Sequence, residues 1–318
     1  MNRLDMRLMF RPMAGLGVAL ALLAVPAALA DGGIEPGDLL HESERLEVRL
    51  LDVSRVEDRS SRFDITFEVI VKDREAVHEV TAEEVRAAPE WLEVRILEAA
   101  DHAVFVLHSR NVAGNMFRTV VVAELDTGAV VDELKANDPS LSPDGRLMAF
   151  ASPIFGGRRR PVNQQIHIYD FSQATAESLE PAHMPVHTVF SSSSGLTADG
   201  EERELFHLLR GPLAWAPDGG WLVTLLGRSG GGHRDQILVV VEDPASQEPT
   251  VRKRTVPVEE EMYREDRRDR YFGPDATREP LEGFTVESFE WIDATRITAR
   301  LEQPPFGMLK EELVLELP

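Results

Sequence analysis

The sequence predicts an all-β protein made of repeated antiparallel sheets, and two observations support this prediction. First, four stretches share one plan: an apolar segment, a tight turn that contains an aspartate, an apolar run, a polar loop and a second apolar run. Second, the apolar runs are short and rich in β-branched and aromatic residues, and turn residues bound them, as is typical of strands. Each stretch therefore predicts three successive antiparallel strands.

The clearest copy of this plan extends from Leu213 to Asp243. Its turn contains Pro217-Asp218-Gly219, in which proline presets φ at the corner and glycine accepts the positive φ that side chains resist. The apolar run Trp221 to Leu226 follows, then a glycine-rich loop and the run Gln236 to Val241. No helix follows the glycine-rich loop, so we do not interpret it as a phosphate-binding loop.

The other three copies centre on Asp101, Asp144 and Asp293. With Asp218, these turn aspartates are 43, 74 and 75 residues apart. The first spacing matches the roughly 40 to 50 residues of a four-stranded β-propeller blade. The longer spacings require insertions or degenerate blades, so we expect about four to six blades or more. Their apolar runs are Ala103 to His108 and Thr119 to Leu125, Leu147 to Ala151 and Gln165 to Phe171, and Arg296 to Leu301 and Glu311 to Leu317.

This repeat resembles that of TolB-type β-propellers, which occur in the periplasmic protein TolB and beside the catalytic domain of prolyl oligopeptidases. The resemblance covers about Glu93 to Pro318, with the best copies at Leu141 and Leu213. It implies a propeller over residues 91–318, with structural turn aspartates and with tryptophans packed between blades. It does not imply a function, because propellers host many activities. The resemblance is to the repeat and not to TolB itself, since Asp31 to Pro89 lacks the strand and helix pattern of TolB's N-terminal α/β domain.

The N-terminus has the three features of a secretory signal peptide. Three arginines precede an apolar run from Met13 to Val25, and Ala28-Leu29-Ala30 forms a small-x-small cleavage site. The alternative is an uncleaved anchor, but two glycines and Pro26 shorten the apolar run below the roughly 20 residues that a membrane span needs. We predict cleavage near Ala30, a periplasmic or secreted protein, and no stable membrane insertion afterwards.

Residues 31–90 are predicted to form a flexible leader and an N-terminal hairpin. Two strands are expected at Leu46 to Val56 and Phe63 to Val71, because apolar and polar residues alternate in the second of them. This hairpin is compatible with an extra blade or with a capping piece. A short helix is expected at 81–88, because Thr81 and Glu84 have the spacing of a capping box and Pro89 follows.

The composition excludes several classes of partner. The net charge is −21, and removal of the signal peptide leaves 31 basic (34 − 3) and 54 acidic (55 − 1) side chains, a net charge of −23. Nucleic acid and anionic membrane are therefore not expected partners, because phosphate contacts come from clusters of Lys and Arg. The charge is compatible with a solvated surface or with a basic partner. The chain has no cysteine, which excludes disulfides and thiolate chemistry.

Two polar segments are candidate binding sites for a protein partner. Arg158, Arg159 and Arg160 form a basic island in an acidic chain, on a loop between two predicted strands. Tyr263 and Tyr271 flank a run of mixed charge, and Tyr and Arg are favoured at protein interfaces. Solvated loops are the alternative interpretation of both segments. The leading hypothesis is a non-enzymatic binding protein of the periplasm or cell envelope.

The second hypothesis is a propeller enzyme, a lyase or hydrolase that acts on a saccharide or another small substrate. We predict no catalytic residue, no metal site and no cofactor. His183 and His187 are separated by Pro185, which keeps them off one helical turn, and no acidic third ligand has a suitable spacing. No histidine is paired in sequence with a nucleophile. Five histidines are the available candidates for a general base: His102, His108, His167, His207 and His233.

Overall fold

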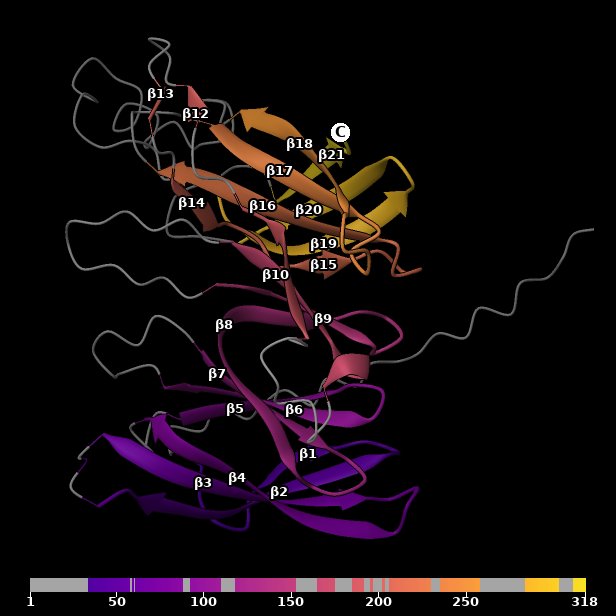
Figure 1. Ribbon diagram of the computed structural model, residues 1–318. Helices are drawn as coiled ribbons and strands as arrows, with labels where there is room; N and C mark the ends of the chain where they lie inside the picture. The colour runs from indigo at the N-terminus through magenta and orange to yellow at the C-terminus, as the bar shows by residue number, and fades with distance from the viewer. Residues whose placement is uncertain are drawn as a thin grey trace, which may run out of the picture.

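The computed structural model describes residues 34–57, 59, 61–87, 92–109, 118–152, 165–174, 185–191, 195–196, 202–203, 206–229, 235–257, 284–302 and 311–318. Within these ranges the regular structure is β-strand, apart from one turn of 3₁₀ helix, η2 (Phe171–Gln173). All strand pairs are antiparallel, and each sheet is built largely from strands that follow one another in the chain. The predicted all-β fold of antiparallel blades is confirmed (Figure 1).

The described strands form five successive blades and one short ribbon. Blade 1 contains β1 (Leu39–Glu42), β2 (Leu46–Arg55), β3 (Arg62–Val71) and β4 (Ala76–Arg86). Blade 2 contains β5 (Leu92–Glu98), β6 (His102–Ser109), β7 (Arg118–Glu124) and β8 (Val130–Leu141). Blade 3 reuses β8 and adds β9 (Leu147–Ala151), β10 (Ile166–Asp170) and β11 (Val186–Phe190).

Blade 4 contains β14 (Phe206–Leu209), β15 (Ala214–Trp215), β16 (Trp221–Ser229), β17 (Asp235–Glu242) and β18 (Thr250–Pro257). Blade 5 contains β19 (Val286–Asp293), β20 (Arg296–Leu301) and β21 (Glu312–Glu316). The short ribbon pairs β12 (Gly195–Leu196) with β13 (Glu202–Arg203). The strands expected for the four repeat copies, and the hairpin of β2 and β3, are therefore present.

Strand β8 belongs to two blades at once. Its first part pairs with β7, and its last part pairs with β9. The register shifts between Asn137 and Ser140, and Asp138 has a φ of +50°. This irregularity redirects the strand, so that the outer strand of blade 2 continues as the inner strand of blade 3. Blades 2 and 3 consequently form one seven-stranded sheet.

Each blade packs face to face on the next through an apolar seam. Phe67 of β3 stacks on Phe105 of β6 at a ring-centroid distance of 4.7 Å, and both side chains are fully buried. In β6, Phe105 faces blade 1 while Val104 and Val106 face blade 3. The middle blades are thus buried on both faces, and the strands at their centres are continuous apolar runs for this reason.

The two terminal blades lie at opposite ends of the stack (Figure 1). No core cluster of the described residues joins them; each cluster links neighbouring blades. The outward faces of both terminal blades carry charged side chains, including Arg49 and Glu68 on blade 1 and Glu287 and Arg300 on blade 5. Glu287 and Arg300 are more than half exposed, and the exposed apolar side chains Val77 and Val314 lie on the same two faces.

The helix predicted at 81–88 is wrong. Residues up to Arg86 continue strand β4, and Thr81 lies opposite Thr66 of β3 with their hydroxyl oxygens 3.0 Å apart. Glu84 has a φ of +50°, and its N–H donates to the carboxylate of Asp64 at 2.8 Å. The capping-box spacing therefore marks an irregularity in a strand, where pairing with β3 satisfies the backbone better than a single helical turn.

Three tryptophans join the blades, as predicted. The indole Nε1–H of Trp215 in blade 4 donates to the carbonyl of Ser140 in blade 3 at 3.1 Å. Trp291 in blade 5 donates in the same way to the carbonyl of Trp215 at 3.0 Å. Its ring also meets Trp221 edge to face, with centroids 6.4 Å apart. Trp91 lies outside the described residues.

Candidate functional site

One edge of the stack is formed by the aspartate turns, and we call it the turn edge. Successive blades contact one another here: Arg45 of blade 1 donates to the carbonyl of Ala99 in blade 2 at 3.1 Å. Ala100 N–H then donates to the carbonyl of Gly145 in blade 3 at 3.0 Å. These contacts between turns fix the spacing of the blades along this edge.

Three of the four turn aspartates have carboxylates that are engaged in their own turns, as the sequence predicts for structural residues, whereas the carboxylate of Asp101 accepts from Arg74 of blade 1 at 2.9 Å. Asp144 accepts hydrogen bonds from the Ser142 hydroxyl at 2.6 Å and from Arg146 N–H at 3.1 Å, and the first of these bonds lowers the pKa of Asp144. Asp218 accepts from Gly220 N–H at 3.0 Å. Asp293 accepts from Thr295 N–H at 2.8 Å and also binds Arg296. The turn edge therefore presents carboxylates that are already satisfied.

The opposite edge is where the strand that follows each aspartate turn ends, and we call it the loop edge. Strands β9 and β16 both run away from an aspartate turn, so their C-terminal ends lie at this edge. At the base of one connection, Ser152 N–H donates to the carbonyl of Gln165 at 2.8 Å. Strand β18 also ends at this edge, and β19 begins there.

The five residues predicted for binding lie outside the described residues. Arg158, Arg159 and Arg160 fall between β9 and β10, and Tyr263 and Tyr271 fall between β18 and β19. The flanking strands show that both connections leave the sheets at the loop edge. The described strands that flank the two candidate segments, which are about a hundred residues apart in sequence, thus end or begin at the same edge of the stack.

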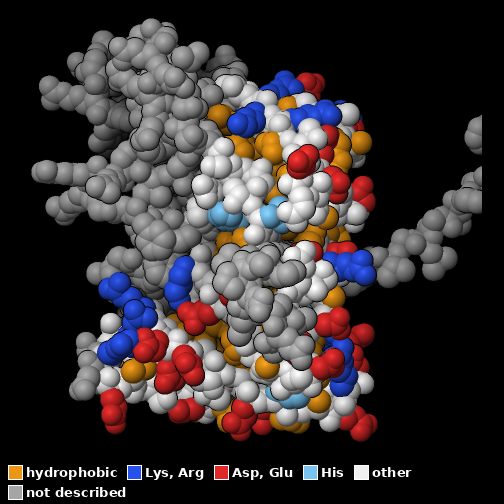
Figure 2. Space-filling view, viewed as in Figure 1, with side chains coloured by type: hydrophobic (Ala, Val, Ile, Leu, Met, Phe, Trp, Pro, Cys, Tyr) orange, Lys and Arg blue, Asp and Glu red, His pale blue; other side chains and the backbone are white. Residues whose placement is uncertain are grey.

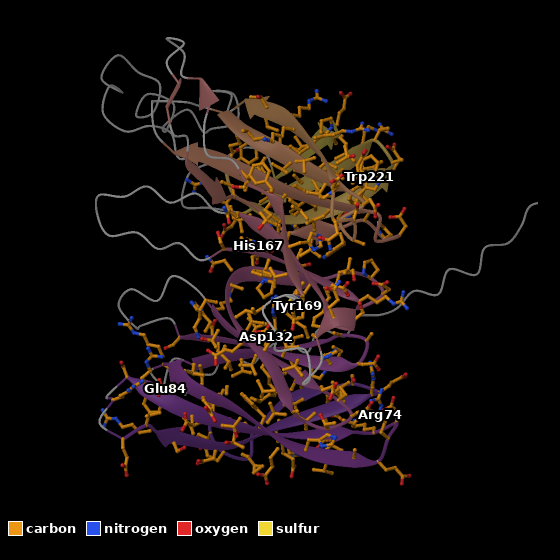
Figure 3. All side chains as sticks on the ribbon, viewed as in Figure 1. Arg74, Glu84, Asp132, His167, Tyr169 and Trp221 are labelled. Carbon is orange, nitrogen blue, oxygen red and sulfur yellow. The ribbon has the colours of Figure 1, made fainter. Side chains whose placement is uncertain are left out.

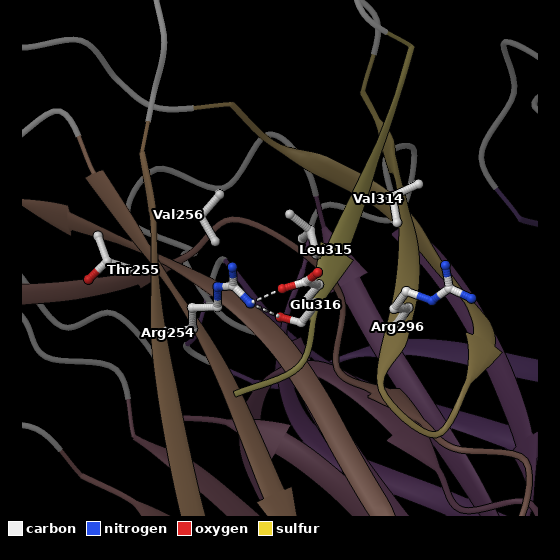
Figure 4. A pocket seen from close by; sticks show the side chains of 7 residues that line it. All are labelled: Arg254, Thr255, Val256, Arg296, Val314, Leu315 and Glu316. Carbon is white, nitrogen blue, oxygen red and sulfur yellow. Dashed lines mark hydrogen bonds and ion pairs between the residues drawn. The ribbon is translucent and has the colours of Figure 1, made fainter.

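A pocket of about 390 Å³ lies between β18 of blade 4 and the strands β20 and β21 of blade 5 (Figure 4). The Arg254 guanidinium donates to the Glu316 carboxylate at 2.9 Å, and Arg296 lies at the other side of the pocket. Val314 is 62% exposed although it is apolar. The pocket thus offers cationic and apolar surface together: Arg254, Thr255, Val256, Arg296, Val314, Leu315 and Glu316.

Strand β18 brings three cations together in an acidic protein. Arg252, Lys253 and Arg254 are exposed, and Lys and Arg side chains gather over this strand (Figure 2). Lys253 lies 4.9 Å from the centre of the Phe190 ring, and Arg252 and Arg254 pair with carboxylates. In the described part of the sheet, β18 is an edge strand. Sequence analysis missed this site, although the Arg-Lys-Arg run within a predicted outer strand was the available signal.

The candidate general bases do not form a catalytic group among the described residues. His167 Nδ1 lies 3.0 Å from the Thr188 hydroxyl, and burial followed by the charge of His187 lowers its pKa (Figure 3). No described carboxylate binds the ring to orient it, as a His-activated nucleophile requires. His108 lies 3.7 Å from Glu93. His233 and the side chain of His207 lie outside the described residues.

His102 and Tyr169 are buried in the seam between blades 2 and 3. His102 Nε2 lies 3.0 Å from the carbonyl of Ala174, and Tyr169 is fully buried. Burial, and then the nearby Asp132 carboxylate, raise the pKa of the Tyr169 hydroxyl well above its usual value (Figure 3). These groups lie within the core, and both rings pack on Phe171, at centroid distances of 5.4 Å for His102 and 5.1 Å for Tyr169. Their arrangement is that of packing residues.

Neither a metal cluster nor a membrane helix is found in the described ranges. No group of three or more His, Asp or Glu side chains there has the spacing to hold a metal ion. No helix in those ranges is long and apolar enough to cross a membrane.

The structure defines the class: an all-β, propeller-type protein of antiparallel blades. The β-propeller domain of the Trilobed protease from Pyrococcus furiosus aligns at 13% identity and a TM-score of 0.34, over 66% of this chain and 48% of that one. An acylaminoacyl peptidase from Pyrococcus horikoshii aligns at 14% and 0.34, over 71% and 32%. An endo-arabinase from Bacteroides thetaiotaomicron aligns at 11% and 0.33, over 90% and 94%.

The chain therefore spans about half of the first of these proteins and about a third of the second. No protein-family model and no curated protein sequence matches it. With TM-scores below 0.5, these similarities carry no argument about activity. The function has to be argued from this chain's own surfaces.

Proposed function

We propose that this chain is an exported propeller-type module, with a TolB-type repeat, that binds a protein partner of the periplasm or cell envelope without catalysing a reaction. One observation carries the proposal: the stack has two unlike edges. The turn edge is closed by tight turns whose carboxylates are engaged, whereas the described strands that flank both segments selected from the sequence end or begin at the loop edge. Connections held by a rigid scaffold are where binding residues concentrate.

The partner chemistry follows from the charges. Arg158, Arg159 and Arg160 stand out in a chain of net charge −21, so the partner segment facing them is expected to be acidic. Tyr263 and Tyr271 would supply aromatic anchors for the same partner. The pocket beside β18 offers a further cationic and apolar contact that suits the same kind of segment.

Replacing the three arginines is expected to abolish capture of the partner. The bait is the tagged protein from Asp31 to Pro318, incubated with a periplasmic extract, and the variant carries Arg158→Ala, Arg159→Ala and Arg160→Ala. Loss of two or three interfacial charge contacts is expected to weaken binding by about tenfold or more. Bound proteins are identified by mass spectrometry.

A matched control removes three arginines elsewhere, with Arg49→Ala, Arg146→Ala and Arg300→Ala. These residues lie on the two end faces and the turn edge, so this control makes the same charge change away from the loop edge. A partner that is retained by the control and lost by the first variant supports the proposal. Equal loss from both variants, or no partner with the unmodified bait, contradicts it.

Export is tested by the N-terminus of the protein in the cell. We expect the mature chain to begin at Asp31, because Ala28-Leu29-Ala30 provides small residues at the cleavage site. N-terminal sequencing of protein from the periplasmic fraction and culture medium checks this. Ala30→Gln should slow cleavage, and a chain that retains residues 1–30 in the cytoplasm would exclude the exported part of the proposal.

A further inference from the structure

Arg210 lies in the seam between blades 4 and 5, and its side chain has no hydrogen-bond or ion-pair partner among the described residues. Its main chain is fixed on both sides, because its N–H donates to the carbonyl of Leu225 at 2.8 Å and its own carbonyl accepts from Val286 N–H at 2.6 Å. The side-chain Nε is buried and makes no hydrogen bond. Within the described structure, no carboxylate pairs with the guanidinium.

Other partly buried arginines differ from Arg210 in this respect. Arg45, Arg62 and Arg95 each donate to a backbone carbonyl, at 3.1, 2.8 and 2.7 Å. The chain has 55 Asp and Glu residues, so carboxylates are abundant. An arginine that binds neither a backbone carbonyl nor a carboxylate in so acidic a chain is available to a ligand.

The side chain of Arg210 lies directly against Gly227 of β16. A Cβ added at Gly227 would lie 2.8 Å from Nε and 2.9 Å from Cγ of Arg210. Both are closer than side-chain atoms approach one another, so a residue other than glycine would displace the arginine. Gly227 therefore provides the space in which the arginine lies.

A second unpartnered polar atom lies on the neighbouring strand, directly opposite Gly227. Gln236 of β17 is the cross-strand neighbour of Gly227, and it is 1% exposed. Its Nε2 donates to the carbonyl of Phe284 at 2.6 Å, which holds the amide in place, but its Oε1 has no partner. The seam thus contains a buried donor on Arg210 and a buried acceptor on Gln236, and neither bonds to the other.

We propose that Arg210 and Gln236 form a binding site for a small carboxylate that carries a hydroxyl or amino group on the adjacent carbon. The carboxylate accepts hydrogen bonds from the guanidinium, and the neighbouring O–H or N–H donates to Gln236 Oε1. The side chain of Arg210 is partly exposed, so solvent reaches the guanidinium, while Gln236 Oε1 is buried behind it in the seam. This inference goes beyond the proposed protein-binding function and is independent of the loop edge.

Three probes of similar size separate the two contacts. Lactate carries both groups, propionate lacks the hydroxyl, and lactamide lacks the carboxylate. Calorimetric titration of the Asp31 to Pro318 protein is expected to show saturable binding of lactate. Propionate should bind about tenfold more weakly, because it leaves the Gln236 acceptor unpaired, and lactamide should not bind.

Two variants assign the contacts. Arg210→Gln should abolish lactate binding, whereas Arg300→Gln on the outward face of blade 5 should leave it unchanged. Gln236→Met should remove the preference for lactate over propionate while propionate still binds, which is a result that mere loss of folding cannot produce. Circular dichroism confirms that each variant is folded.

Three outcomes overturn the proposal. Failure of lactate to bind the unmodified protein would show that the two unpartnered atoms do not form a carboxylate site. Binding that survives Arg210→Gln places the ligand elsewhere. Equal affinity for lactate and propionate in the unmodified protein removes the role of Gln236.

Discussion

Phe105→Ala is expected to lower the free energy of unfolding by about 3 to 5 kcal/mol, the range for truncating a buried aromatic side chain. Phe105 is fully buried in the seam between blades 1 and 2, and its ring stacks on that of Phe67. The substitution removes apolar contacts from both blades and leaves a cavity between them. Urea denaturation, monitored by tryptophan fluorescence and by circular dichroism, measures the change.

The stack architecture adds a second expectation for the same variant. Each core cluster joins neighbouring blades, so a weakened first seam leaves the seams of blades 3 to 5 intact. The described tryptophans, Trp215, Trp221 and Trp291, lie in blades 4 and 5. In a Trp91→Phe background, which removes the tryptophan that precedes β5, circular dichroism should therefore report loss of blade 1 at lower urea than fluorescence reports loss of blades 4 and 5.

Val77→Ala is the control, since Val77 lies on the outward face of blade 1 and is 61% exposed. Its effect should stay within about 0.5 kcal/mol, as for other surface substitutions. If Phe105→Ala costs no more than this control, the seam between blades 1 and 2 is not a close-packed core.

The repeat could be predicted from the sequence because its signals are local. A turn such as Pro143-Asp144-Gly145 needs particular residue types for its own backbone geometry, and Gly145 does adopt a positive φ of +69°. Strands buried on both faces are continuous apolar runs whatever their neighbours are. Both patterns can therefore be recognised in the sequence without any knowledge of the tertiary structure.

The features that were missed depend on contacts between distant segments. The spacing of Thr81 and Glu84 suits a helix cap, but pairing with β3 decides the outcome, and a local pattern does not contain that information. The passage of β8 from one blade to the next depends on the backbone at Asp138, which is not a glycine. The long spacings likewise conceal β11 and β14, which complete the neighbouring blades.

The two candidate sites, the arginine cluster and the site at Arg210, also differ in whether the sequence alone can reveal them. Arg158 to Arg160 were selected because a cluster of like charges is visible in the sequence. Arg210 is a single arginine in the sequence, and its interest lies in the absence of a partner within the described structure and in the unpaired acceptor of Gln236 nearby. An unsatisfied group is visible only in the folded structure, because the sequence does not show which donors and acceptors meet.

Gly128→Ala is expected to destabilise the protein by about 2 to 5 kcal/mol, and two costs contribute. Gly128 has a φ of +72°, which costs an L-residue about 1 to 2 kcal/mol. The new Cβ would also lie 2.5 Å from Cβ of His78 in blade 1, and overpacking of this kind costs about 1 to 3 kcal/mol. His78 cannot yield freely, because its Nε2 lies 3.0 Å from the carbonyl of Leu125.

Gly219→Ala separates these two costs. Gly219 has nearly the same φ, +74°, but the closest atom to a new Cβ is Cδ of Pro143 at 3.7 Å, an ordinary contact distance. This variant should therefore lose only the backbone contribution, about 1 to 2 kcal/mol. The difference between the two variants, measured by urea denaturation, isolates the contact between blade 1 and the turn of blade 2. Equal destabilisation by both substitutions would show that His78 moves without cost, and that the blades are less closely fitted at the turn edge than the structure shows.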